Sequence, residues 1–187
     1  INHAIIVYRD TDQKELLSQS IDPDLAQELD LSYVKGGDSR QKSVVNALRS
    51  APPETKLVFV HDGARPLVSL RSIEALYQAV SADAAAALAH PVSDTIKRLP
   101  NKTGLKQIKP EDLERDRLWA METPQAFQIS LLKDAYEEVE RSGLPVTDDT
   151  AAIAAIDKSL TIVSNPDPNP KLTTPEDLHY LEYLLSR

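Results

Sequence analysis

A carboxylate, a glycine and an arginine lie close together in the segment V-H-D-G-A-R-P at residues 60–66. The run L-V-F-V-H at 57–61 reads as a buried strand, and in open α/β sheets ligands bind beyond the carboxyl ends of such strands. Asp62 would there position Mg²⁺ or a ribose- or phosphate-bearing ligand, and Gly63 would permit close approach of the backbone. The structural alternative is that Asp62 caps the next helix and Arg65 pairs with it.

A single lysine follows the proline-rich segment N-P-D-P-N-P at residues 165–170. Each proline removes a backbone donor and fixes φ, so we expect a stiff loop that is neither helix nor inner strand. An ammonium group in that loop is suited to stabilising charge that develops on a phosphoryl group. Lys171 is therefore a candidate catalytic residue.

The segment G-G-D-S-R-Q-K-S-V at residues 36–44 is typical of a turn that opens a helix. Free backbone N–H groups together with Ser39, Arg40 and Ser43 would there face an anion or the edge of a base. A simple capped helix start accounts for the same residues equally well. The segment T-D-D at 147–149 is read only as a helix cap with acidic first-turn residues.

Residues 93–122 are rich in charged residues and proline and form an excursion from the core. A charge run of this kind is usually a solvated face, and that interpretation stays open here. The alternative is that the excursion supplies binding groups. Its candidates are Thr95, Lys97, Arg98, Arg115 and Arg117.

Composition limits the class of protein. The 187 residues carry a formal net charge of −8, which argues against a nucleic-acid surface, although a local basic pocket can still bind a small anion. There is no cysteine, which excludes disulfides and thiolate metal sites and fits a reducing compartment. No apolar run approaches the roughly 20 residues that span a bilayer. We therefore expect one cytoplasmic domain.

Strand and helix signals alternate as a parallel sheet with crossover helices requires. The L-V-F-V-H strand is expected in the middle of that sheet, Gly143 is expected to end one helix, and Thr174 is expected to cap another. Strands are expected at residues 3–8, 31–35, 57–61, 84–92 and 159–163, with less regular ones near 94–99 and 117–122. Helices are expected at residues 11–20, 40–50, 69–82, 129–142, 147–157 and 175–185.

Six motifs, taken in their order along the chain, closely resemble those of the 2-C-methyl-D-erythritol 4-phosphate cytidylyltransferases of the non-mevalonate isoprenoid pathway. They are G-G-D-S-R-Q-K-S-V, V-H-D-G-A-R-P, P-V-S-D-T-I-K, R-L-W-A-M-E-T-P-Q-A-F, T-D-D and N-P-K-L-T-T-P-E-D-L. The resemblance runs through essentially the whole chain. It implies a Rossmann-like α/β fold, similar to nucleotide-diphospho-sugar transferases, with a mostly parallel sheet, helices on both faces and an extended β-arm for dimerisation.

The resemblance also implies an activity. A member of this family transfers a cytidylyl group from CTP to methylerythritol phosphate, requires Mg²⁺ and releases pyrophosphate. The attacking phosphate oxygen displaces pyrophosphate in line, so positioning and charge stabilisation carry the catalysis. A ribitol 5-phosphate cytidylyltransferase and a catalytically inactive paralogue that acts as a binding module are the two alternatives. The compartment would be the cytoplasm, or the plastid stroma in a plant or alga.

Roles for individual residues follow from the same resemblance. Lys171 would stabilise the α-phosphate in the transition state, and Asp62 would lie near the nucleotide and hold the metal. The substrate phosphate would contact Arg65, and Thr95 and Arg115 would complete that site across a homodimer, because residues 93–122 form a swapped arm within the domain 1–187. CTP would contact Gly37, Asp38, Ser43, Asp62 and Gly63.

One family feature has no counterpart in the printed sequence. The family begins with a strand and a glycine-rich loop that grips the triphosphate, whereas the five glycines here start at Gly36. We therefore expect an N-terminal segment to be absent from this chain, and little activity from a polypeptide that begins at Ile1. A smaller departure is Pro170, which stiffens the approach to Lys171.

Overall fold

The computed structural model describes residues 1–100 and 106–186, apart from the side chain of Gln27. These residues form two compact units. Unit 1 consists of Ile1–Val60 and Phe127–Ser159, and unit 2 consists of His61–Ala126 and Leu160–Arg187. Part of the expected arm, residues 101–105, lies outside the described residues.

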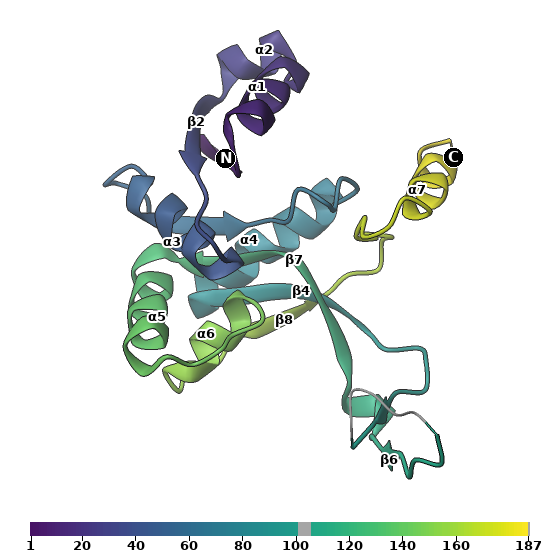
Figure 1. Cartoon of the computed structure of the whole chain (residues 1–187). Helices are drawn as coiled ribbons and strands as arrows, with labels where there is room; N and C mark the ends of the chain where they lie inside the picture. The colour runs from purple at the N-terminus through teal and green to yellow at the C-terminus, as the bar shows by residue number, and fades with distance from the viewer. Residues whose placement is uncertain (101–105, 187) are drawn as a thin grey trace. The chain divides into compact units, whose positions relative to one another are not determined.

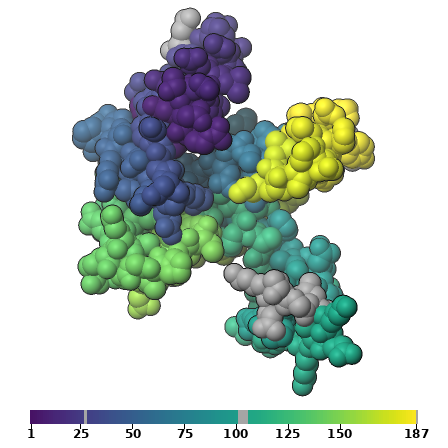
Figure 2. All heavy atoms as spheres, viewed as in Figure 1, coloured from purple at the N-terminus to yellow at the C-terminus, as the bar shows by residue number. Residues whose placement is uncertain are grey.

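Unit 1 opens with two parallel strands, β1 (His3–Tyr8) and β2 (Asp30–Lys35), with His3 opposite Asp30 and Tyr8 opposite Lys35. Both strands confirm the expected positions. The helix between them also begins where the sequence indicates, because the Asp10 side chain accepts a hydrogen bond from the Gln13 N–H. This helix is drawn in purple in Figure 2, and none of its residues is buried. The remaining elements of unit 1 are α1 (Thr11–Ser20), α2 (Pro23–Glu28), α3 (Arg40–Ser50), β3 (Leu57–Val60), α5 (Ile129–Ser142) and α6 (Asp149–Ala155).

The main sheet has the strand order β3-β7-β4-β8. Strand β4 (Ala85–Pro91) pairs in parallel with β8 (Thr161–Ser164), with Ala86 opposite Thr161, and β7 (Trp119–Gln128) lies on the other side of β4. The first five residues of β4 are fully buried alanines and a leucine, as a strand covered on both faces requires. Figure 1 shows β4, β7 and β8 side by side. The expected α/β class is confirmed.

One expectation about this sheet is wrong. The L-V-F-V-H run was expected in mid-sheet, but among the described strands β3 lies at the edge, and its four residues are only partly buried. An apolar run indicates that both faces of a strand are covered. It says nothing about how many neighbours the strand has, so composition alone could not place it.

The helices of unit 2 are α4 (Leu70–Asp83) and α7 (Asp177–Leu185). Ser69 caps α4 by accepting from the Ser72 N–H, so Asp62 is not the cap of that helix. The expected Thr174 cap is also wrong: the Asp177 carboxylate, inside α7, accepts from the Thr174 N–H at 2.8 Å and from the Thr173 N–H. Among the described residues, no helix is long and apolar enough to cross a membrane.

The excursion leaves β4 and returns through β7 (Figure 1). Its described part contains a short antiparallel pair, β5 (Lys97–Arg98) with β6 (Glu111–Asp112), followed by a 3-10 turn, Arg115–Arg117. Lys97 pairs with Asp112, and the Arg98 guanidinium lies 3.0 Å from the Glu111 carboxylate. Two of the basic candidates are therefore matched with acids across the hairpin.

Candidate active site

Two loops of unit 2 are held together by a backbone hydrogen bond and a side-chain hydrogen bond. The Leu172 N–H donates to the Ala64 carbonyl at 2.8 Å, and the Arg65 guanidinium donates to the Asn169 carbonyl at 2.7 Å. The residues after β3 and the residues after the proline-rich segment therefore lie side by side. The Asn169 carbonyl thus holds the Arg65 guanidinium.

Asp62 and Lys171 face each other across these two loops. The Lys171 ammonium lies 2.6 Å from the Asp62 Oδ2 atom. The Lys171 side chain is 44% exposed and that of Asp62 is 20% exposed, so a ligand can reach both groups. The structure thus brings Lys171 close to Asp62 and Arg65, two candidates that precede it by more than a hundred residues.

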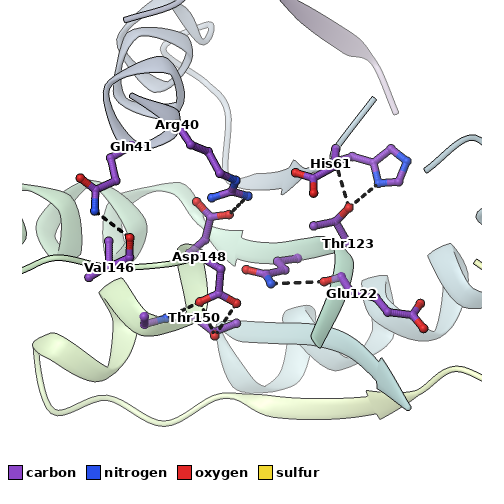
Figure 3. A network of polar contacts seen from close by, with 12 residues as sticks. Arg40, Gln41, His61, Glu122, Thr123, Val146, Asp148 and Thr150 are labelled. Carbon is purple, nitrogen blue, oxygen red and sulfur yellow. Dashed lines mark hydrogen bonds and ion pairs between the residues drawn. The ribbon is translucent and has the colours of Figure 1, made fainter. Parts of the chain in front are cut away.

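His61 and Thr123 fix the start of the first loop (Figure 3). The Arg65 carbonyl accepts a hydrogen bond from the His61 Nε2 atom at 2.9 Å, so this nitrogen carries a proton. The Thr123 hydroxyl, 3.1 Å from His61 Nδ1, also accepts from the Asp62 N–H at 3.0 Å. Burial lowers the pKa of His61 below its usual 6.5, which favours the neutral ring.

A buried carboxylate that the motif analysis did not select lies behind the second loop. Glu122 is 3% exposed, and its Oε2 atom accepts from the side-chain amides of Asn165 and Asn169, each at 2.8 Å. Its Oε1 atom lies 2.5 Å from His90 Nδ1. The motif R-L-W-A-M-E-T-P-Q-A-F contains this residue but gives it no role, because its partners are 32, 43 and 47 positions away.

The G-G-D-S-R segment lies in unit 1 and forms the capped start of α3. The Ser39 side chain accepts from the Lys42 N–H, which is the simple helix start allowed by the sequence. The Ser43 hydroxyl accepts from the Gly37 N–H at 3.1 Å and donates to the Ser39 carbonyl. A Cβ atom at Gly37 would lie 2.3 Å from the Lys42 Cβ atom, so the tight turn requires glycine.

Asp38, the next residue, pairs with the first turn of α3. Its carboxylate accepts from the Lys42 ammonium at 2.8 Å, an exposed pair four residues apart. The hydrogen bond from Lys42 lowers the pKa of Asp38. Gly37, Asp38 and Ser43 belong to unit 1, whereas Gly63 and the other candidates belong to unit 2.

A second buried carboxylate lies within unit 1. Asp149 is fully buried and accepts from the Tyr136 hydroxyl at 2.5 Å and the Arg40 guanidinium at 2.7 Å (Figure 3 shows Arg40). Burial and the neighbouring carboxylate raise the pKa of Tyr136. The T-D-D segment therefore does more than cap a helix: Asp148 caps α6, and Asp149 pairs with the arginine at the start of α3.

Thr95 and Arg115 line one cavity in the excursion. The cavity has a volume of about 500 Å³ and is walled by the segments Thr95–Ile96 and Leu113–Arg117. The Arg115 guanidinium donates to the Ser93 carbonyl at 3.3 Å. The two residues predicted to share a phosphate site are thus neighbours.

Among the described residues, no group of three His, Cys, Asp or Glu side chains could hold a metal ion. Asp62 is the carboxylate that pairs with the partly exposed Lys171 ammonium. Mg²⁺ is commonly bound by one or two carboxylates, with substrate phosphates and water as its other ligands. Asp62 therefore fits a metal that arrives with a nucleotide, but not a metal held by protein ligands alone.

Comparison with known proteins agrees with this architecture. The solved 4-diphosphocytidyl-2C-methyl-D-erythritol synthase from Anaerococcus prevotii is similar with a TM-score of 0.85 and 27% identity, over 100% of this chain and 80% of that chain. The bifunctional IspDF from Campylobacter jejuni is similar with a TM-score of 0.72 and 26% identity, over 96% of this chain and 42% of that chain. The chain therefore has the α/β fold of these enzymes.

A model of the family described as 2-C-methyl-D-erythritol 4-phosphate cytidylyltransferase matches residues 1–187. The protein of that name from Desulforamulus reducens is 40% identical over 157 residues, which are 84% of this chain and 65% of that protein. The chloroplastic protein of that name from Oryza sativa is 35% identical over 182 residues, which are 97% of this chain and 59% of that protein. The chain belongs to this family, and it spans less than two thirds of the length of these relatives.

Proposed function

We propose that the chain transfers the cytidylyl group of CTP to 2-C-methyl-D-erythritol 4-phosphate and releases pyrophosphate. The observation that carries the proposal is the cluster of Asp62, Arg65 and Lys171 on two loops that hydrogen bonds hold together. Membership of the cytidylyltransferase family supports the choice of reaction.

The proposed chemistry needs no protein nucleophile. A phosphate oxygen of the acceptor attacks the α-phosphorus of CTP in line, that P–O bond forms, and the bond to pyrophosphate breaks. Lys171 moves from Asp62 to the α-phosphate, where its charge offsets the negative charge that builds up in the transition state. Arg65 is held against the Asn169 carbonyl and presents its remaining donors to the acceptor phosphate.

Mg²⁺ is the proposed cofactor, and Asp62 is the residue proposed to hold it. When bound, the ion neutralises phosphate charge and orients the leaving pyrophosphate. The Lys171 ammonium contacts the Oδ2 atom of Asp62, and once it turns to the α-phosphate this oxygen would bind the ion. Asp62 would hold the ion and Lys171 would stabilise the α-phosphate, so both cations would offset charge on the nucleotide phosphates.

The nucleotide is proposed to contact Gly37, Asp38, Ser43 and Gly63. The Asp38 carboxylate, the Ser43 hydroxyl and the Gly37 N–H have partners within unit 1, and these contacts would be exchanged for contacts to the base and ribose when CTP binds. A Cβ atom added at Gly63 would have no atom within 4 Å, so the space beside this residue is open to a ligand.

The acceptor site is proposed to be completed by a second copy of the chain. Residues 93–122 would cross as an arm, and the cavity lined by Thr95 and Arg115 would then take the phosphate end of the acceptor. Thr95 and Arg115 supply a hydroxyl and a guanidinium, which suit a phosphate monoester. We place the homodimer in the cytoplasm, or in the plastid stroma in a plant or alga.

A competition assay tests the proposed substrate. The full-length protein is given CTP, Mg²⁺ and equal amounts of methylerythritol phosphate and ribitol 5-phosphate, and the two cytidine diphosphate products are separated by mass. The methylerythritol product is expected to form faster, with one pyrophosphate released for each product. Faster formation of the ribitol product would reject the proposed acceptor, and release of pyrophosphate without either product would reject the transfer.

A further inference from the structure

The loop that carries Lys171 is held by its side chains. Prolines occupy positions 166, 168 and 170, so every second residue lacks a backbone donor. The residues that alternate with them are Asn165, Asp167 and Asn169. Each of the three has a side-chain partner outside the loop.

Two of these three contacts converge on one carboxylate oxygen, Oε2 of Glu122. The side-chain amides of Asn165 and Asn169 donate to it, each at 2.8 Å. The Asn169 amide also donates its second proton to the Thr123 carbonyl at 3.0 Å. Asp167 is held separately, by the Ser69 hydroxyl at 2.6 Å.

Glu122 is itself held on the sheet. It lies within β7, and its second oxygen contacts His90 near the end of β4, the neighbouring strand. The exposed fractions of Glu122, Asn165 and Asn169 are 3%, 7% and 5%, so water competes little for these hydrogen bonds. The Glu122 carboxylate therefore connects strands β4 and β7 to the proline-rich loop.

Asn169 connects Glu122 to both loops of the candidate site. Its carbonyl accepts from the Arg65 guanidinium at 2.7 Å, and Lys171, two residues later, reaches Asp62. We propose that Glu122 is a positioning residue for the cytidylyl-transfer site, which sets Lys171 and Arg65 through Asn165 and Asn169. This inference rests on the function proposed above.

The test compares two substitutions with different hydrogen-bonding capacity. Glu122→Gln keeps an oxygen that accepts from both asparagine amides, and its NH₂ group donates to a neutral His90 ring. Glu122→Ala removes the acceptor that the two amides share, and Asn169 then keeps only its bond to the Thr123 carbonyl. Misplacement of a catalytic group by about 1 Å costs about 100-fold. We therefore expect Glu122→Ala to lower kcat about 100-fold with little change in the KM for CTP, and Glu122→Gln to stay within about fivefold of the wild type.

A double-mutant cycle distinguishes positioning from general loss of structure. If Glu122 acts through Lys171 and Arg65, Glu122→Ala lowers kcat much less once Lys171→Ala is present than it does in the wild type, and the loss that remains is the part that runs through Arg65. Additive losses would overturn the proposal, as would an equal loss in Glu122→Gln. Val139→Ala, which truncates a buried side chain of α5 in unit 1, is the control for lower stability and should leave kcat unchanged. If Glu122→Ala does not fold, Asn169→Ala takes its place in the cycle.

A second readout does not depend on activity. The Leu172 N–H, which donates to the Ala64 carbonyl, should exchange with solvent faster in Glu122→Ala and at the wild-type rate in Glu122→Gln. Unchanged exchange in Glu122→Ala would overturn the positioning role. If the wild type shows no transfer while the exchange rates behave as expected, the proposed function fails and the role of Glu122 in holding the loop stands.

Discussion

His61 shows how a residue next to the candidate site can act without contacting a ligand. Its ring joins the Arg65 carbonyl to the Thr123 hydroxyl, and that hydroxyl also holds the Asp62 N–H. All three contacts are satisfied by a neutral ring with the proton on Nε2. A charged ring would carry a second proton on Nδ1, so this nitrogen could no longer accept the hydrogen bond from the Thr123 hydroxyl.

The lowered pKa of His61 predicts a pH dependence of stability. The unfolded chain takes up a proton near pH 6.5, before the folded protein does, because burial lowers the pKa in the fold. The contribution of His61 to stability is therefore complete above pH 6.5 and is lost as the pH falls. Urea unfolding of wild type and His61→Gln at several pH values should show a steeper loss on acidification for the wild type. Parallel curves would contradict this.

Several chemistry-bearing residues could be predicted from their local sequence. Asp62 and Lys171 follow a strand and a proline-rich loop, and the structure brings them to 2.6 Å. The contacts of Glu122 and Asp149 could not be predicted, because folding alone brings their partners close to them. Sequence spacing therefore finds the exposed groups of such a site more readily than the buried groups that hold them.

At the scale of elements, the ends of three helices follow from the sequence, whereas the start of α7 does not. The helices α1, α3 and α5 have the bounds expected from the sequence, because Asp10, Ser39 and Gly143 mark their ends. Gly143 adopts the left-handed conformation, with φ of 66°, that favours glycine at this point. The helix α2 was missed, since its six residues are too few to show apolar periodicity, although Asp22 and Pro23 carry a start signal.

The arm is the element whose proposed role reaches beyond one chain. An Arg115→Ala subunit paired with an Asp62→Ala subunit should regain about one working site per mixed dimer, because an intact arm then meets an intact Asp62. Two different affinity tags would isolate the mixed dimers for assay.

A wild-type subunit paired with the double variant is the matched control and should have no working site if the arms cross. The opposite pattern, with activity only in that control pair, would show that each arm serves its own subunit. Thr95→Ala in place of Arg115→Ala should behave in the same way, since both residues line the same cavity.

At the scale of the whole molecule, the fold class followed from the alternation of strand and helix signals. The order of the strands did not follow, because β3 is apolar and still lies at an edge among the described strands. A net charge of −8 fits binding of an anionic nucleotide only if cations are concentrated locally. Unit 2 meets that condition at Arg65 and Lys171. The exposed apolar side chains of α7, the yellow helix in Figure 2, include Leu178, Tyr180, Tyr183 and Leu185.

The rate of label transfer from CTP labelled at its α-phosphorus to methylerythritol phosphate tests the central claim most directly. In the full-length protein, Lys171→Ala should lower kcat about 100-fold or more, equivalent to about 2.7 kcal/mol, with the KM for CTP within about threefold of the wild type. The exposed Lys158→Ala serves as the control and should match the wild type. An unchanged kcat in Lys171→Ala, or no transfer of label by the wild type, would contradict the account.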